Sequence, residues 1–395
     1  MTELPNEQAM RSYRLDRIRS LMAEADVAGL VLFDPVNIRY ATGSRNMQVW
    51  TMHNPCRYAF IATGGPVIMF DLGSSKHLAA GLETIDEIRP ASAWDYMMVG
   101  SRNNEMAAKW AAEIADLVDR HGGGNKRLAM DRADWLPVQA LQKLGVEIED
   151  GKAITERARQ IKSTDEIKAM RISFDACEES IAVLKSRLKP GMRENEALGI
   201  LMQANLDRGG EYPETRLLSS GPRTNPWFQE TSDRVMEVGD LMSFDTDLIG
   251  PYGIYTDISR SWVVGGGLPT DEQRRLYELS ARQLDHNIAL LRPGMGFVEY
   301  GEKSYPLPGE FLANRYADVA HGCGMGVEYP LILYPEDEEH GLYDGVFEAG
   351  MVVCVESYIG AVGAREGVKL EQPVLITENG PELFITDCPL EDDYF

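Results

Sequence analysis

Three aspartates stand close together in SFDTDLIGPYGIYTDISRSW, residues 243–262, where strand-forming residues otherwise dominate. In an extended chain, successive side chains point to opposite faces, so Asp245 and Asp247 share one face while Phe244 takes the other. Two neighbouring carboxylates repel each other, and a buried carboxylate needs a counter-ion. The pattern therefore predicts that Asp245, Asp247 and Asp257 are metal ligands.

The turn GPYG at residues 250–253 makes this stretch a hairpin. A hairpin centred on two residues would place Asp257 opposite Thr246, on the wrong face for the acidic pair. We therefore expect an odd-length loop or a bulge, which shifts the register by one and brings Asp257 to Asp245 and Asp247.

Further candidate ligands lie downstream. His321 is in VAHGCGMGVEYP, Glu356 is the one charge in GMVVCVESYIG, and Glu371 is in EGVKLEQPVLITENG. Each alone is more typical of a structural histidine or of a glutamate at a strand edge. With the three aspartates they make a set of five carboxylates and one imidazole, which suits two divalent ions such as iron, manganese or zinc.

The segments that must position these residues change in character near residue 151. Before it, strand-like runs alternate with helix-like segments, the pattern of an α/β domain. The strand-like runs are 29–33, 59–62 and 67–70, and the helix-like segments are 14–25 and 104–121. We expect two domains, at residues 1–160 and 161–395.

The second domain begins with a long amphipathic helix. Ser163 and Glu166 form a capping-box signature, and Pro190-Gly191 ends the helical pattern. A similar design, from Thr-Asp-Glu to Pro-Gly-Met, recurs at residues 270–295, which suggests a duplicated half-domain with two related halves across a cleft.

Composition excludes several function classes. The net charge is −23 with an isoelectric point near 4.7, and the basic residues form no stripe, so no nucleic-acid partner is expected. The sequence has no signal peptide and no apolar run of about 20 residues, so we expect a cytoplasmic protein without membrane contact. Its five cysteines show no paired short spacing, which argues against a disulfide framework and a thiolate zinc site.

The order of the candidate ligands resembles that of the pita-bread metalloenzymes: methionine aminopeptidase, aminopeptidase P, prolidase and creatinase. This resemblance implies an α+β fold, with a duplicated pita-bread catalytic domain after an α/β N-terminal creatinase-like domain, in a homodimer. By motif match it also implies five metal ligands, which are Asp245, Asp257, His321, Glu356 and Glu371. Asp247 is an additional carboxylate.

The DTD pair points to a subgroup, the dimethylsulfoniopropionate (DMSP) lyases of the pita-bread type, which bind two metals, often iron, through six ligands. The similarity covers nearly the whole chain, in NIRYATGSRNMQVWTMHNP, ETRLLSSGPRTNPWFQE, SFDTDLIGPYGIYTDISRSW and KLEQPVLIT. It implies a lyase that cleaves DMSP, or a close onium carboxylate, to dimethyl sulfide and acrylate. The two ions would be bridged by Asp257 and Glu371, with iron expected first and manganese or zinc as alternatives.

Two departures from the related enzymes bear on the reaction. The peptidases place a proton-handling histidine before the first metal aspartate, and RTNPWFQETSDRVMEVGD contains none. The lyases carry a proton-abstracting aspartate six residues after the metal histidine, where this chain has Val327, which cannot take a proton. The base could instead be Glu328, Tyr316 as phenolate, or a metal-bound hydroxide, and activity on DMSP is expected to be weak or absent.

Aromatic faces should hold the sulfonium of such a substrate by cation–π attraction. The candidates are Trp50, Trp227, Tyr255 and Tyr316, of which Tyr316 matches a tyrosine of the lyases. In the expected homodimer, Trp50, His53 and Arg57 would help to close the active site of the partner.

Two other functions stay open from the sequence. One is a metal-dependent hydrolase of a C–N bond in a small zwitterionic or amide substrate, in which Glu356 would be the proton partner of the nucleophile. The other is an inactive binding module, against which the retention of all six ligands argues.

Overall fold

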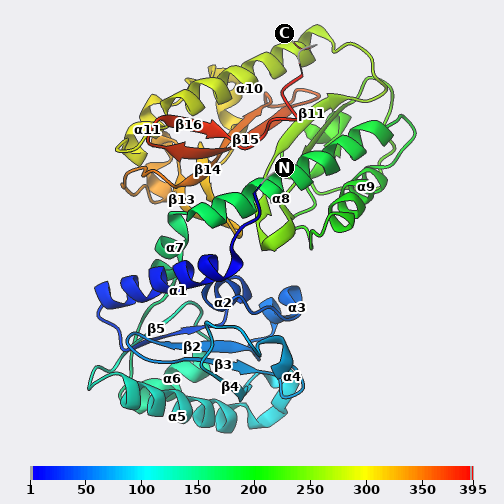
Figure 1. Ribbon diagram of the computed structural model, residues 1–395. Coiled ribbons are helices and arrows are strands. Elements are labelled where there is room, and N and C mark those ends of the chain that lie inside the picture. The colour runs from blue at the N-terminus through cyan, green and yellow to red at the C-terminus, as the bar shows by residue number, and fades with distance from the viewer. Residues whose placement is uncertain (1–2, 392–393, 395) are drawn as a thin grey trace. The chain divides into compact units, whose positions relative to one another are not determined.

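The alternating strand-like and helix-like runs of the first part of the chain form a separate unit. A computed structural model describes residues 3–391 and 394 and divides the chain into two units (Figure 1). The first unit is Asn6–Arg159, and the second runs from Gln160 to the C-terminal end and takes in residues 3–5.

A six-stranded mixed sheet is the centre of the first unit. Its order is β4-β3-β2-β1-β5-β6, with β2 antiparallel to β1 and β3 and the other pairs parallel. Helices α1 and α2 lie on one side of this sheet, and α5 and α6 on the other (Figure 1). The bounds are α1 Glu7–Glu24, β1 Gly29–Leu32, α2 Pro35–Thr42, α3 Gln48–His53, β2 Tyr58–Ala62, β3 Val67–Asp71, β4 Glu87–Pro90, α4 Tyr96–Val99, α5 Asn103–His121, β5 Arg127–Met130, α6 Trp135–Lys143, β6 Glu147–Asp150 and α7 Lys152–Gln160.

Large aromatic rings fill the space between this sheet and α5. Trp110 of α5 is fully buried, with its ring centre 4.9 Å from that of Trp94 and 5.9 Å from that of Phe33. Burial of such rings contributes much of the stability of a core. The strands and helices expected from the sequence in this part of the chain are confirmed.

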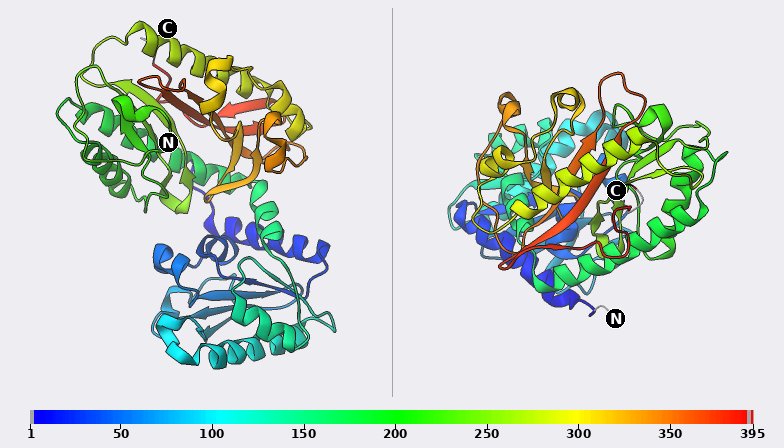
Figure 2. Two further views of the ribbon diagram at one scale, coloured as in Figure 1. Left: turned by 180° about the vertical axis from the view of Figure 1, so that it is seen from behind. Right: turned by 90° about the horizontal axis from the view of Figure 1, so that it is seen from above.

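The second unit contains two halves with the same order of elements. Each begins with a long helix whose N-terminus has a capping box, formed by Ser163 and Glu166 in α8 and by Thr270 and Gln273 in α10. A shorter helix and a set of strands follow in both halves, and Figures 1 and 2 show the long helices on the outside of the strands. This parallel agrees with the duplication suggested by the sequence.

The strands of the second unit form a three-stranded sheet in the order β11-β8-β7, a short β9-β10 pair, and a five-stranded sheet in the order β13-β12-β14-β15-β16. The bounds are α8 Thr164–Arg187, α9 Glu194–Asp207, β7 Leu218–Ser220, β8 Leu241–Asp245, β9 Leu248–Ile249, β10 Tyr255–Thr256, β11 Ser259–Val263, α10 Asp271–Leu290, α11 Phe297–Lys303, β12 Ala320–Cys323, β13 Val327–Ile332, β14 Val352–Ile359, β15 Val368–Thr377 and β16 Gly380–Leu383. Among the described residues, no helix combines the length and the apolar character needed to cross a bilayer.

The acidic hairpin has the odd-length loop that the sequence predicted. Three residues, Pro251–Gly253, form its turn, and β9 pairs with β10 in the same register in which β8 pairs with β11. This register places Asp257 opposite Asp247. The backbone of Asp247 has a φ of 42°, a left-handed conformation that is uncommon outside glycine and that separates β8 from β9.

Candidate metal centre

The strands of both halves bring the six predicted ligands together in the interior. Asp245 ends β8, Asp247 follows it, and Asp257 lies between β10 and β11. His321 lies in β12, and Glu356 of β14 pairs directly with Glu371 of β15. All six side chains are buried.

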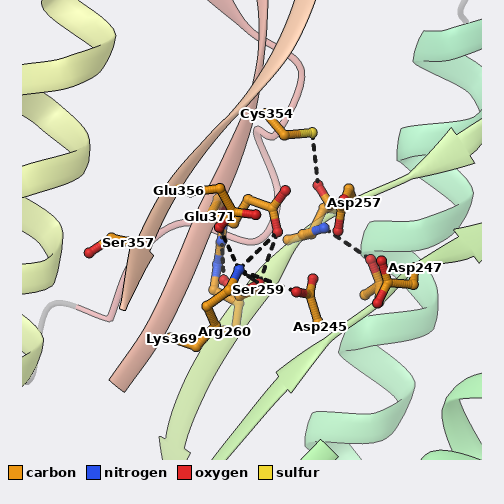
Figure 3. Close-up of polar contacts among 12 residues, drawn as sticks. Asp245, Asp247, Asp257, Ser259, Arg260, Cys354, Glu356, Ser357, Lys369 and Glu371 are labelled. Carbon is orange, nitrogen blue, oxygen red and sulfur yellow. Dashed lines mark hydrogen bonds and ion pairs between the residues drawn. The ribbon is translucent and has the colours of Figure 1, made fainter. Parts of the chain in front are cut away.

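His321 lies at the centre of three carboxylates. Its Nε2 is 3.4 Å from Glu356 Oε1, 3.5 Å from Asp257 Oδ2 and 3.7 Å from Glu371 Oε1. Asp245, Asp247 and Asp257 form a second group, in which one oxygen of each lies within 4.8 Å of the others. Figure 3 shows the five carboxylate side chains of these two groups converging from the two sets of strands.

Several buried oxygens of this cluster lack a hydrogen-bond partner. They are Asp245 Oδ1, Asp257 Oδ1, Glu356 Oε1 and Glu371 Oε1. Buried acceptors are nearly always satisfied in folded proteins, so unpaired carboxylate oxygens facing one another indicate a place for cations. Carboxylates with one imidazole are a donor set that fits divalent iron, manganese or zinc.

The charges of the cluster shift one another's pKa. Burial and the repulsion from Asp245 raise the pKa of Asp247 to about 7. Burial and the charge of Glu371 raise the pKa of Asp257 well above its usual range. Burial alone would lower the pKa of His321, but the neighbouring Glu356 and Asp318 carboxylates raise it well above its usual value. The cluster therefore holds more negative charge than the protein neutralises by itself.

Comparison with known proteins identifies the family and the fold of the chain. The family model for metallopeptidase family M24 matches residues 168–378, and that for the creatinase/prolidase N-terminal domain matches residues 14–161. The chain belongs to metallopeptidase family M24. Dipeptidase PepE from Mycobacterium ulcerans shares the fold, with a TM-score of 0.76 at 22% identity, covering 98% of each chain. The pita-bread fold with a creatinase-type N-terminal domain is thus confirmed.

Two relatives of this M24 chain are named as lyases. The dimethylsulfoniopropionate lyase DddP of Roseovarius nubinhibens is 41% identical over 96% of this chain and 86% of its own length. The protein of that name from Roseobacter denitrificans is 40% identical with the same coverage. The resemblance to the DMSP lyases is therefore confirmed.

Lys369 is a member of the cluster that the sequence analysis missed. Its Nζ lies 2.6 Å from Glu356 Oε2, 3.2 Å from Asp245 Oδ2 and 3.3 Å from Glu371 Oε2, and it donates to Ser259 Oγ at 2.7 Å (Figure 3). The side chain is fully buried. A single lysine within KLEQPVLIT did not by itself predict a place in the cluster, although Lys369 is on the same strand face as Glu371.

Asp247 is held by two hydroxyl groups. Thr215 and Tyr255 each donate to one of its carboxylate oxygens. Tyr255, predicted as a substrate-binding residue, is fully buried, and its hydroxyl is occupied by this bond. The contact shown for Tyr255 is therefore with a candidate ligand, which it orients.

Glu328, a predicted base, forms a buried ion pair. Its Oε2 accepts from Lys162 Nζ at 2.8 Å and its Oε1 accepts from the Met325 backbone at 2.7 Å. It lies beside Val327 in β13, but Val327 is 51% exposed whereas Glu328 is buried. The two side chains point to opposite sides, as expected for adjacent strand residues.

The glycine-rich stretch before this strand leaves room for Glu328. A Cβ atom on Gly324 would lie 2.4 Å from Glu328 Oε2, and one on Gly322 would lie 2.4 Å from the Tyr329 carbonyl oxygen. Glycine at position 324 therefore leaves room for the Glu328 carboxylate, and glycine at position 322 lets β12 pass close to the backbone of β13.

Aromatic rings adjoin the acidic cluster through Lys369. The Lys369 ammonium lies 4.5 Å from the ring centre of Tyr316 and 6.0 Å from that of Trp227. Phe228, which the sequence analysis did not select, has its ring centre 5.2 Å from that of Tyr316. The structure thus places two of the predicted aromatic residues beside the cluster, and Phe228 packs against one of them.

A further buried carboxylate, Asp318, was also missed. Burial raises its pKa to about 7, and its Oδ1 has no hydrogen-bond partner. Its position three residues before His321 was a possible signal, but a single aspartate in a loop is usually a turn residue.

The three predicted residues of the N-terminal unit lie outside this cluster's unit. Trp50 and His53 are on α3 and are exposed, with 39% of Trp50 accessible. Arg57 is buried within its own unit, where it pairs with Asp71 at 3.0 Å and donates to Ser44. This pairing gives Arg57 a structural contact, and the predicted substrate-binding roles of the three residues stay predictions.

Proposed function

We propose that the chain is a metal-dependent lyase that cleaves DMSP or a close onium carboxylate, with dimethyl sulfide and acrylate as the products of DMSP. Identity of 40–41% over 96% of the chain to two proteins named DMSP lyases supports this assignment. The chain also lacks a histidine in residues 223–240, where the peptidases place their proton-handling histidine.

The proposal rests on one observation: the carboxylate cluster and an aromatic face lie next to each other. One ammonium group, that of Lys369, contacts both Glu356 and the ring of Tyr316. An aromatic face that attracts a cation is what a sulfonium group requires. A zwitterionic substrate with its carboxylate toward the cluster and its sulfonium toward Trp227, Phe228 and Tyr316 would match both parts.

The metal ligands in this proposal are the six buried residues of the cluster. Asp245 and Asp247 would hold one ion, His321 and Glu356 the other, and Asp257 and Glu371 would bridge them. Bound divalent ions supply Lewis acidity, which makes the proton next to a substrate carboxylate more acidic. Iron is the first expectation, with manganese or zinc as alternatives.

Elimination needs a group that accepts the proton from the carbon next to the carboxylate. The electron pair of that C–H bond forms the C=C bond of acrylate, and the C–S bond breaks to release dimethyl sulfide. Glu328 is occupied by Lys162, and burial raises the pKa of Tyr316 well above its usual value, which disfavours a phenolate. We propose Asp318 as the acceptor, because it is buried, has an unpaired oxygen and has a pKa near neutrality, where a general base works best.

Headspace measurement of dimethyl sulfide tests the proposed function. Protein stripped of metal and then loaded with iron, manganese or zinc should contain two ions per chain and release equal amounts of dimethyl sulfide and acrylate. The stripped protein and a Glu356→Gln variant are the controls and should release neither. If fully loaded wild type and Val327→Asp both release no dimethyl sulfide, the lyase assignment is wrong and hydrolysis of a C–N bond should be assayed instead.

A further inference from the structure

A thiol lies among the candidate metal ligands. Cys354 precedes Glu356 by two residues in β14, so both side chains are on the same face of the sheet. In the pairing of β12 with β14, Cys354 is directly opposite His321. Figure 3 shows its sulfur pointing toward Asp257, and the side chain is fully buried.

The Cys354 sulfur lies within reach of three candidate ligands. Ligand atoms of Asp257, His321, Cys354 and Glu371 all lie within 4.8 Å of one another. The contact of the thiol with the Asp257 carbonyl oxygen, at 4.0 Å, is long and leaves the sulfur without a strong hydrogen bond there. Asp257 Oδ1 and Glu371 Oε1, which belong to two of these three ligands, are buried and have no hydrogen-bond partner.

We propose that Cys354 is a ligand of the ion held by Asp257, His321 and Glu371, so that the two metal positions of this chain differ in chemistry. One position, formed by Asp245, Asp247 and Asp257, offers oxygen alone. The other offers oxygen, an imidazole nitrogen and sulfur. The inference goes beyond the six-ligand set of the proposed function and does not depend on which substrate is cleaved.

A sulfur ligand changes which ions the second position selects. Thiolate favours zinc, cobalt and iron over manganese and magnesium, which prefer oxygen. In the metal-free chain, burial raises the pKa of the Cys354 thiol, so the sulfur is protonated. Coordination replaces this proton by the ion, and the proton passes to the buffer.

Cys323 is a matched control thiol. It lies two residues after His321 in β12, and its sulfur contacts the Tyr255 carbonyl oxygen at 3.5 Å. It is as buried as Cys354 but belongs to no group of candidate ligands among the described residues. A serine at either position removes one thiol from the same interior region.

Cobalt(II) titration of the metal-free protein tests the proposal by absorption spectroscopy. Wild type and Cys323→Ser should develop a sulfur-to-cobalt charge-transfer band in the near ultraviolet as cobalt binds. Cys354→Ser should lose this band while equilibrium dialysis still finds bound cobalt. In competition, the preference of Cys354→Ser for zinc over manganese should fall at least about tenfold, the scale on which the surroundings of a metal change its affinity.

Absence of the band in wild type saturated with cobalt would overturn the proposal, and so would a band of equal intensity in Cys354→Ser. Zinc X-ray absorption of the wild type gives a second measurement that needs no variant, and it should show a sulfur neighbour. Zinc surrounded by nitrogen and oxygen alone would refute the proposal even if Cys354→Ser failed to fold. None of these measurements uses DMSP, so their outcome is independent of the lyase assignment.

Discussion

The Lys369 ammonium lies 2.6 Å from Glu356 Oε2, and neither side chain is exposed to water. Burial alone would lower the pKa of Lys369, but Asp245, Glu356 and Glu371 raise it well above its usual value. The chain therefore carries a fixed positive charge inside the cluster. Two divalent ions would neutralise four of the five carboxylates, and Lys369 is placed to neutralise the fifth.

Replacing this lysine should affect the metal-free chain most. Removing one partner of a buried ion pair leaves uncompensated charge and costs about 3–5 kcal/mol of the free energy of unfolding. Without metal, the free energy of unfolding of Lys369→Met should be lower than that of wild type by about this amount. Added manganese should restore more stability to the variant than to wild type, because the ammonium group that repels the ion is gone. Urea unfolding with and without manganese measures both effects.

An exposed ion pair of the same type gives the control. Lys303 pairs with Glu299 on α11, where 52% of the lysine side chain is accessible. Lys303→Met should lose less than about 1 kcal/mol, with or without metal. Equal losses for the two variants would show that Lys369 does not compensate buried charge.

The candidate ligands were predictable because their types are unusual for their local setting. Asp245 and Asp247 stand in a strand-like sequence, where buried carboxylates need a reason, although Asp247 itself lies between β8 and β9. The position of Asp257 could be deduced from hairpin register. Helix ends were equally predictable, since the capping boxes at Ser163 and Thr270 depend on residues only three apart.

Lys369, Asp318 and Cys354 were not predictable by the same reasoning. A lysine, an aspartate or a cysteine is ordinary in its local sequence, and the significance of each comes from strands distant in the chain. Short spacings between cysteines indicate metal ligands that come from one loop, whereas Cys354 lies opposite His321 on a neighbouring strand. Glu328 was selected for its closeness to Val327, but its partner, Lys162, lies far away in sequence.

Stability of the metal-free chain should fall as pH rises toward neutrality through Asp247. Its pKa is about 7 in the folded chain, against an ordinary value of about 3.9, so the folded state keeps a proton that the unfolded state loses. The stability that this retained proton contributes is fully present below about pH 4 and is lost as the pH rises to about 7. Urea unfolding in a chelator at pH 5, 6 and 7 should show a flatter dependence for Asp247→Asn than for wild type.

Metal should reverse the sign of this dependence. Ligands bind an ion only after losing their protons, so metal affinity rises with pH over the same range. If Asp247→Asn and wild type lose stability in parallel in the chelator, the proton of Asp247 is not the cause.

We predict that the chain forms a homodimer. Met47, Val49 and Trp50 are exposed apolar side chains within four residues of one another, and exposed apolar groups that gather in this way mark interaction sites. Light scattering at micromolar concentration should give twice the mass of the chain, and Trp50→Asp should weaken the association. A monomer under these conditions would contradict the prediction.

The Asp318 carboxylate should determine how the rate depends on pH. If it accepts the substrate proton, Asp318→Asn should lower dimethyl sulfide release by about 10²–10⁴-fold and remove the rising limb of the pH–rate profile. Its metal content should be unchanged, which separates loss of a base from loss of a ligand. Asp285→Asn on the exposed side of α10 is the control and should keep both the rate and the profile.

Val327→Asp should increase the release of dimethyl sulfide from DMSP. Val327 begins β13 and is 51% exposed, so a carboxylate there stays hydrated and the free energy of unfolding should change by no more than about 0.5 kcal/mol. A positioned base is worth about 10²–10⁴-fold in rate where none is present. Because Asp318 is the proposed base of the wild type, Val327→Asp should gain a comparable factor only in an Asp318→Asn background, in which both variants of this comparison are measured. Leu331→Asp, at another exposed position of the same strand, is the matched control and should gain nothing, because it adds the same charge elsewhere. Equal rates for these two variants would show that position 327 does not face the reacting carbon in this chain, and the pocket would then have been reshaped for a different substrate.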